Sequence, residues 1–150
     1  MVMNAKSVDI VLEDIAPTKE QLEELYDQLK RRSYSISHGF LPQYEDHIEF
    51  VKNHPYRAWF MIKQVGGTIG NVYVQYDNSI GLNCVDDITE VQIKNILHVL
   101  TSKLTPLDAA PSVRSGDFFL NVSSSNAELQ DKLKNIGLPE IQKSFCLVKD

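Results

Sequence analysis

Histidine and tyrosine side chains are the first candidates for acid-base chemistry in this 150-residue chain. His38 lies in a polar and aromatic stretch with a glycine and a proline, which predicts a surface loop. A histidine there can exchange a proton near neutral pH, and the alternative is a solvated loop histidine without a role. Tyr73 and Asn83 occupy strand-like positions from which a side chain can point into a cleft, and the alternative for Tyr73 is cross-strand packing. We therefore take His38 and Tyr73 as candidate catalytic residues.

The remaining histidines and the two cysteines do not have the spacing of a metal site. His47 and His54 are seven residues apart, and His98 falls beside an amphipathic stripe, so we interpret all three as structural. Cys84 and Cys146 each lie inside a strand-like run without a neighbouring cysteine, which is typical of small buried hydrophobic side chains. The sequence predicts no metal ion.

Length and charge limit the classes of protein and partner. A chain of 150 residues with 43% hydrophobic residues predicts one domain, 1–150, with a core that needs no disulfide. The net charge of -5 argues against nucleic acid and anionic membrane as partners, and the absence of a signal peptide or spanning segment predicts a cytoplasmic protein. The one basic run, Lys30-Arg31-Arg32, falls where a helix should end; it complements the helix dipole or, alternatively, binds a phosphate.

Three short runs of aromatic and β-branched residues between 57 and 85 must position these candidates. The turn dipeptides Gly66-Gly67 and Asp77-Asn78 separate the runs and predict an antiparallel meander. Hydrophobic periodicity and capping signals predict the flanking elements. Before the meander these are a strand at Val8–Leu12 and helices from Thr18 to Arg32 and from Pro42 to His54. After it comes a helix that starts with the pair Asp87 and Glu90 and ends before Pro106, followed by a strand at Asp117–Val122. The last two elements are a helix that starts with the capping pair Ser125 and Glu128 and ends at Gly137, and a strand at Ile141–Val148.

A right-handed crossover through the third helix makes strand 117–122 parallel to the last strand of the meander. The predicted fold is therefore an α/β (α+β) domain with a mixed six- or seven-stranded sheet and helices on both faces.

This element order, with Ile80-Gly81-Leu82 on the fourth strand and Asn126 eleven residues before Gly137-Leu138, resembles the GCN5-related N-acetyltransferase (GNAT) superfamily over nearly the whole chain. Several shorter pieces are similar to the branch that acetylates amino groups of nucleotide-linked amino sugars. They are Ser35-Ile36-Ser37-His38, Tyr44-Glu45-Asp46-His47, Phe50-Val51 and His54-Pro55-Tyr56-Arg57-Ala58-Trp59.

The resemblance implies a splayed pair of parallel strands with the pantetheine arm of the co-substrate acetyl-CoA in the gap. A small-molecule amine then attacks the thioester directly, while a backbone amide of the fourth strand stabilises the oxyanion. His38 falls in the loop that would face this acceptor. The cofactor-binding residues so implied are Asn83, Cys84, Val85, Asp86, Gln92 and Asn126. Asn126 has the alternative role of capping the fourth helix, and formation of a homodimer is left open.

Two positions depart from the pattern of the superfamily. Its pyrophosphate loop of alternating glycines corresponds here to the glycine-free, acidic residues 87–94, a degenerate form of the motif. The tyrosine that commonly reprotonates the leaving thiolate corresponds to Leu133. Two functions therefore stay open: an acetyl-CoA-dependent N-acetyltransferase acting on a small amine such as an amino sugar, or a catalytically silent module of the same fold that binds a ligand or protein.

Overall fold

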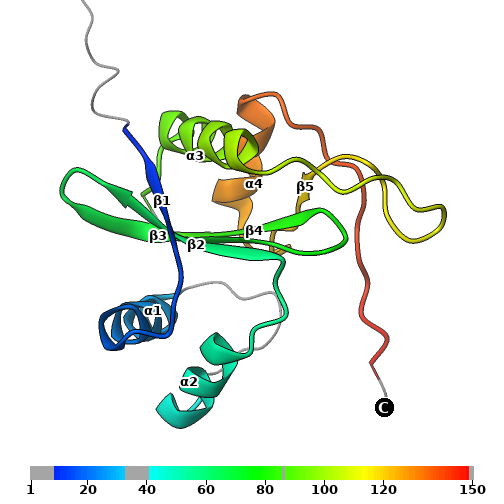
Figure 1. Ribbon diagram of the computed structural model, residues 1–150. Coiled ribbons are helices and arrows are strands. Elements are labelled where there is room, and N and C mark those ends of the chain that lie inside the picture. Colours follow the sequence, from blue (N-terminus) through cyan, green and yellow to red (C-terminus); the bar gives the residue numbers. More distant parts are fainter. Residues whose placement is uncertain (1–8, 33–40, 86, 149–150) are drawn as a thin grey trace, which may run out of the picture.

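The computed structural model describes residues 9–32, 41–85 and 87–148, and a mixed sheet forms its centre (Figure 1). The five strands follow the spatial order β1-β2-β3-β4-β5. Their bounds are β1 Val11–Asp14, β2 Ala58–Gln64, β3 Gly67–Val74, β4 Ser79–Cys84 and β5 Phe119–Leu120. All neighbours are antiparallel except β4 and β5, which are parallel. The predicted α/β class, meander and parallel pair are confirmed, whereas the described residues form five strands instead of six or seven.

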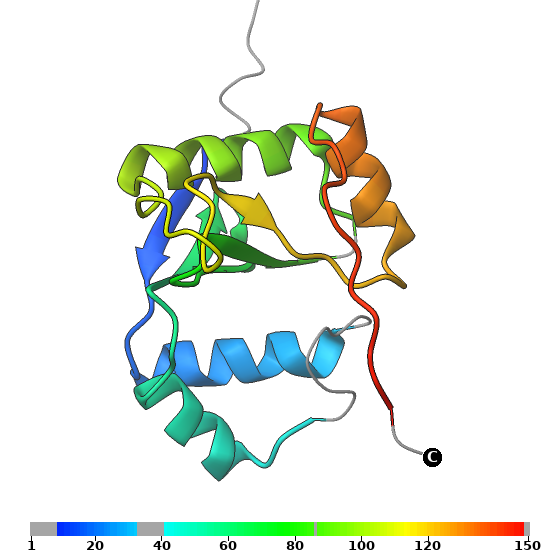
Figure 2. The same cartoon turned by 90° about the vertical axis from the view of Figure 1, so that its right-hand side faces the viewer.

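Helices cover both faces of this sheet, as predicted. Figure 2 shows α1 (Lys19–Arg31) and α2 (Tyr44–Lys52) below the sheet, and α3 (Glu90–Lys103) and α4 (Ala127–Asn135) above it. None of the helices in the described residues is long and apolar enough to cross a bilayer.

Alternation of side chains along β2 divides the interior into two cores. Phe60 and Ile62 belong to the larger core with α3 and α4, whereas Met61 between them packs with Leu22 and Val51 below the sheet. Because both faces are buried, the strands of the meander consist of nearly continuous apolar residues. The two cores hold β2, β3 and β4 rigidly between the helical layers, which fixes the sheet edge described below.

Side chains cap three of the four helices in the described residues, and two of these caps differ from the predicted ones; α2 begins at Tyr44 instead of Pro42, and its N-cap Gln43 makes no side-chain cap bond. At α1 the hydroxyl of Thr18 accepts the Gln21 N–H at 3.2 Å, as the sequence predicts. At α3 the cap is Thr89 instead of Asp87, because Thr89 and Gln92 form a complete capping box. The predicted cap of α4, Ser125, is also wrong, since Asn126 occupies the cap position and accepts the Leu129 N–H.

The end of α4 at Gly137 agrees with the prediction. Gly137 has a φ of +97°, in the left-handed region. The Leu138 N–H donates to the Leu133 carbonyl and the Gly137 N–H donates to that of Lys134, both at 3.0 Å, which is the Schellman pattern.

The predicted final strand, Ile141–Val148, is not present. These residues have no regular structure, and Phe145 and Leu147 are 89% and 96% exposed. Cys146 is exposed as well, so its interpretation as a buried side chain is wrong. A strand needs a partner edge as well as an alternating sequence, and the outer strand β5 has only two residues. The predicted strand 117–122 is shortened to Phe119–Leu120 in the same region.

His47 is a buried structural histidine, as predicted, and it should make stability depend on pH. Its Nε2 lies 2.9 Å from the Leu22 carbonyl and therefore carries the proton, while burial lowers its pKa below 6.5. Because the unfolded chain binds a proton at higher pH than the folded one, the free energy of unfolding should fall as the pH falls below about 6.5. The slope from this one group is at most about 1.4 kcal/mol per pH unit.

Urea unfolding between pH 7.5 and 5 measures this effect. A His47→Gln variant should be less stable at pH 7.5 but should lose less stability on acidification, since its side chain does not titrate. The exposed His98→Gln variant is the control and should follow the wild type. Equal slopes for wild type and His47→Gln would contradict the assignment.

Candidate active site

The parallel strands β4 and β5 separate soon after they pair. Their ladder contains Ser79 opposite Phe119 and Ile80 opposite Leu120, and the Asn121 N–H donates to the Ile80 carbonyl at 3.3 Å. Beyond this bond, no further pair joins the two strands in the described residues. The predicted divergence of these strands at their carboxyl ends therefore agrees with the structure.

Backbone groups of β4 are left facing the gap. The Val85 N–H donates to the Ile69 carbonyl and the Ser79 carbonyl accepts from Gln75, so odd-numbered residues of β4 direct their backbone toward β3. Even-numbered residues point the other way, because backbone groups alternate along a strand. Leu82 and Cys84 thus present N–H and C=O groups to the gap, without a strand partner on that side among the described residues.

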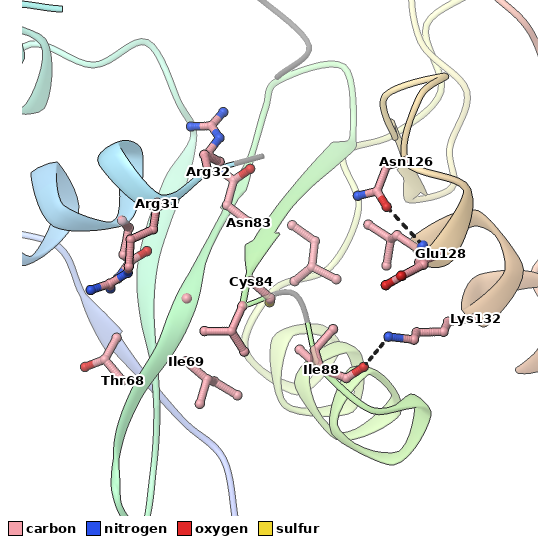
Figure 3. Close-up of a pocket in the computed structure, with 15 residues that line it drawn as sticks. Arg31, Arg32, Thr68, Ile69, Asn83, Cys84, Ile88, Asn126, Glu128 and Lys132 are labelled. Atoms are coloured by element: carbon pink, nitrogen blue, oxygen red, sulfur yellow. Dashed lines mark hydrogen bonds between the residues drawn. The ribbon is translucent and has the colours of Figure 1, made fainter. Parts of the chain in front are cut away.

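A cavity of ≈ 320 Å³ occupies this gap and continues around the end of β4. Figure 3 shows arginines of the α1 end on one side of β4, and residues of α4 on the other. We call this cavity the β4 cleft. Its lining residues are Gln28, Arg31, Arg32, Thr68, Ile69, Gly70, Leu82, Asn83, Cys84, Val85, Ile88, Asn126, Glu128, Leu129 and Lys132.

The β4 cleft brings together four of the predicted site residues. Asn83, Cys84, Val85 and Asn126 line it. Asn126 also caps α4, so the alternative role predicted for it is observed, whereas its cofactor-binding role stays a prediction. Gln92 and Tyr73 do not line the cleft, and His38 and Asp86 lie outside the described residues.

The side chain of Gln92 forms hydrogen bonds at the start of α3. Its Oε1 accepts the Thr89 N–H at 2.8 Å, and its Nε2 donates to Gln64 Oε1 at 3.2 Å. The Thr89 hydroxyl in turn accepts the Gln92 N–H at 3.1 Å. Side chains therefore occupy part of this helix N-terminus, the kind of position at which bare amides bind anions in other proteins.

Cys84 contributes its backbone to the cleft, but its thiol is not suited to nucleophilic attack. Burial raises the pKa of Cys84 to about 12, so the thiolate is scarce at neutral pH. The side chain is only partly buried, packed against the larger core, where the prediction was a buried one.

Tyr73 lies on the α1 face of the sheet. Its ring stacks on Tyr56 with centroids 4.0 Å apart, and a Cβ built on Gly81 would lie only 2.0 Å from it. Burial raises the pKa of Tyr73, the nearby Arg32 lowers it, and Asp77 raises it further. Burial also raises the pKa of Tyr56 to about 12, with a further increase from Tyr73 and a decrease from Arg32. Both phenols are thus protonated donors at neutral pH, close enough to Arg32 to feel its charge.

A hydrogen-bonded network orients Asn83 at the cleft. Asn71 Oδ1 accepts from Trp59 Nε1 at 2.9 Å and from Asn83 Nδ2 at 3.4 Å, and Asn71 Nδ2 donates to Gln28 Oε1 at 2.7 Å. Because Asn71 is buried, these bonds satisfy its amide and connect α1 to β2, β3 and β4.

The prediction missed the charged residues of the cleft. Lys132 Nζ donates to the Ile88 carbonyl at 2.6 Å, which holds an ammonium group beside the start of α3, and Glu128 lies one turn earlier on α4. The sequence did contain a signal for Glu128 and Lys132. Their i, i+4 spacing after Asn126 places both side chains on one face of the fourth helix. Arg31 and Arg32 belong to the basic run for which we considered complementation of the helix dipole and, as the alternative, a phosphate site. No cluster of metal-binding side chains occurs in the described residues.

Comparison with known proteins identifies solved structures that have a similar fold. No family model and no curated protein matches the sequence. Among solved structures, the aminoglycoside acetyltransferase AAC(6')-Iy in complex with the bisubstrate analogue CoA-S-monomethyl-acetylneamine is 16% identical, with a TM-score of 0.56 over 95% of this chain and 97% of that one. An integron cassette protein from the mobile metagenome of V. cholerae is 13% identical (TM-score 0.56, 96% and 93% covered). A possible acetyltransferase from Clostridium difficile 630 is 10% identical (0.53, 94% and 97%). The chain therefore has a GNAT-like acetyltransferase fold.

Proposed function

We propose that the protein is an acetyl-CoA-dependent N-acetyltransferase that acts on a small amine, with the β4 cleft as its active site. The observation that carries this proposal is the backbone edge of Leu82 and Cys84, which has no strand partner among the described residues and lies in a cavity of ≈ 320 Å³. Such an edge can bond to the amide groups of a pantetheine arm in the way a strand binds an extended peptide. The neighbour AAC(6')-Iy, crystallised with a CoA bisubstrate analogue, supports acetyl-CoA as the co-substrate.

The residues of the cleft suit direct transfer. An outward N–H of β4 donates to the thioester oxygen and stabilises the negative charge that develops there. The neutral amine attacks the thioester carbon and forms the new C–N bond; the C–S bond breaks, and CoA leaves as its thiolate, which takes up a proton from solvent. We propose His38, six residues beyond Arg32 in the sequence, as the group that accepts the amine proton. Tyr73 lies on the α1 face outside the cleft lining, so it is proposed as a hydrogen-bond donor only to a part of the acceptor that extends beyond the cleft.

Acetyl transfer from acetyl-CoA to a panel of amines and amino sugars, followed by mass spectrometry, tests the proposal. In His38→Ala we expect turnover to fall by about 100-fold, as for loss of a general base, with little change in the affinity for acetyl-CoA. His98→Ala is the matched control and should keep full turnover. Unchanged turnover in His38→Ala would remove this residue from the mechanism, and no acetylated product from any amine would remove the enzymatic function.

A second function has its own support. The N-terminus of α3 carries Glu90 and is closed by the capping box of Thr89 and Gln92. Leu133, the position that corresponds to the family's tyrosine, is buried in the larger core. These features favour a catalytically silent module that binds its ligand in the same cleft. Binding of acetyl-CoA without turnover on any acceptor would support this alternative.

Lys132 is our candidate for the phosphates of acetyl-CoA, because it places a positive charge at the end of the cleft near the start of α3. In Lys132→Met we expect the Kd of acetyl-CoA to rise about tenfold, or about 1.4 kcal/mol, as for a lost charge-assisted hydrogen bond. Calorimetric titration measures it. Lys134→Met is the matched control, since Lys134 lies in the same helical turn but pairs with Glu140 outside the cleft. Equal affinities in wild type and Lys132→Met would show that the phosphates bind elsewhere.

A further inference from the structure

The charges of the β4 cleft differ between its two ends. At the α1 end, Arg31 and Arg32 line the cleft together with Gln28, and no carboxylate of the described residues lines this end. The one acidic lining residue, Glu128, comes from α4 on the opposite side of β4, as does Lys132 (Figure 3). The residues that line the α1 end of the cleft therefore carry two positive charges and no negative charge.

Lys30 lies next to the two arginines in the sequence but does not line the cleft, so the position of Arg31 and Arg32 is not a property of every cation at this helix end. Lys30 precedes the two arginines in the same basic run, yet it pairs with Asp27 at 3.7 Å and lies over the Tyr26 ring, away from the cleft. Dipole complementation alone requires only that a cation be near the last turn of α1. It does not explain why two of three cations line a cavity.

Two phenol groups interact electrostatically with Arg32. The stacked phenols of Tyr56 and Tyr73 are close enough to interact with its charge, and both are protonated at neutral pH. Asp77, whose charge raises the pKa of Tyr73, uses its carboxylate to accept the Ser79 N–H at 2.9 Å. Guanidinium and phenol groups donate hydrogen bonds, and arginine in particular matches the two oxygens of a carboxylate or phosphate.

We propose that the acceptor amine carries an anionic group, a carboxylate or a phosphate, which Arg31 and Arg32 bind at the α1 end of the cleft. This proposal rests on the proposed acetyltransferase function. It assigns the α4 end, with Lys132, to the phosphates of acetyl-CoA, and the α1 end to the acceptor. A polycationic acceptor of the aminoglycoside type is disfavoured, because its ammonium groups would face the two arginines.

Four amino sugars test the charge preference: glucosamine, glucosamine 6-phosphate, muramic acid and the polycation neamine. We expect kcat/KM for the phosphate or the carboxylate compound to exceed that for glucosamine at least tenfold, and neamine to be the poorest acceptor. In the double variant Arg31→Gln/Arg32→Gln this ratio should fall to near one, while the Kd of CoA stays within about twofold of the wild type. Lys30→Gln is the matched control and should keep the ratio.

Titration of the CoA-bound protein with glucosamine 6-phosphate and with muramic acid gives a second measurement that does not need turnover. Arginine-dependent binding of either compound supports the proposal, and the compound that binds tells phosphate from carboxylate. The proposal is overturned if no anionic compound binds in an arginine-dependent way, or if the double variant loses CoA affinity and keeps the anion preference. If CoA itself does not bind, the proposed function fails separately, and the same titrations of the free protein still decide the anion site.

Discussion

Replacing Asn78 with alanine should lower the free energy of unfolding by at least about 3 kcal/mol, the sum expected for several orphaned buried groups. Asn78 is fully buried, between β3 and β4. Its Nδ2 donates to the carbonyls of Leu107 and Ser115 at 2.9 and 2.8 Å, and its Oδ1 accepts the Leu107 N–H at 2.8 Å. Alanine would leave three backbone groups of the loop between α3 and β5 unsatisfied.

The backbone at this position adds to the cost. Asn78 has a φ of 73°, a left-handed conformation that asparagine tolerates better than alanine does. Its carbonyl also accepts the Phe119 N–H at 3.2 Å, at the start of the β4–β5 pair. We therefore expect the variant to loosen β5, and with it the β4 cleft.

Urea unfolding of three variants separates these contributions. Asn78→Gly removes the side-chain bonds but accepts the φ, so it should be more stable than Asn78→Ala and still clearly weaker than wild type. Ser112→Ala is the control, because Ser112 has a similar φ of 64° on an exposed loop, and its stability should change by less than about 1 kcal/mol. A loss below about 1 kcal/mol in Asn78→Ala would contradict the anchoring role.

Replacing Leu129 with tryptophan should abolish or strongly weaken acetyl-CoA binding. Leu129 lines the β4 cleft from α4 and packs partly against the larger core. The indole group adds volume that the packed side has no room to accept, so it must project into the cleft. We expect the Kd of acetyl-CoA to rise at least about tenfold, or about 1.4 kcal/mol.

Calorimetric titration, with near-UV circular dichroism to confirm the fold, measures this effect. Val91→Trp is the matched control, since Val91 is an apolar residue on the exposed side of α3 and does not line the cleft. It should bind acetyl-CoA as the wild type does. A folded Leu129→Trp protein with wild-type affinity would place the cofactor outside the β4 cleft.

The meander was the part of the fold most accessible to prediction. Its strands are short, apolar and separated by turn dipeptides, and each pairs with its sequence neighbour, so local signals suffice. The helix over 90–103 followed from the spacing of Ile93, Ile96 and Leu100, all of which are fully buried. The crossover rule then gave the parallel orientation of β5.

The C-terminal residues and the helix caps needed information that the local pattern does not contain. The alternation in Ile141–Val148 describes a strand, but pairing depends on a partner edge, and β5 is too short to provide one. At α4, Ser125 and Asn126 are both good capping residues, and the pattern alone did not decide between adjacent candidates.

The strand residues of the candidate site could be predicted from the sequence, whereas the charged side chains that line the cleft could not. Asn83, Cys84 and Val85 follow from strand order and line the cleft, while their binding of a cofactor stays a prediction. Arg31, Arg32 and Lys132 come from two helices on opposite faces, and only the tertiary arrangement shows that they line the same cavity. Tyr73 satisfied the strand pattern, but its ring lies over Gly81 on the α1 face, outside the cleft lining.

Amide hydrogen exchange in the presence and absence of CoA tests the central claim, that the outward edge of β4 binds the cofactor. Within the part of the chain that the structure describes, the N–H groups of Leu82 and Cys84 have no strand partner on that side, so they should exchange quickly in the free protein and become protected when CoA binds. Those of Asn83 and Val85, which face β3, should change little. Binding of CoA with protection elsewhere and none at residues 82 and 84, or no binding at all, would contradict the account.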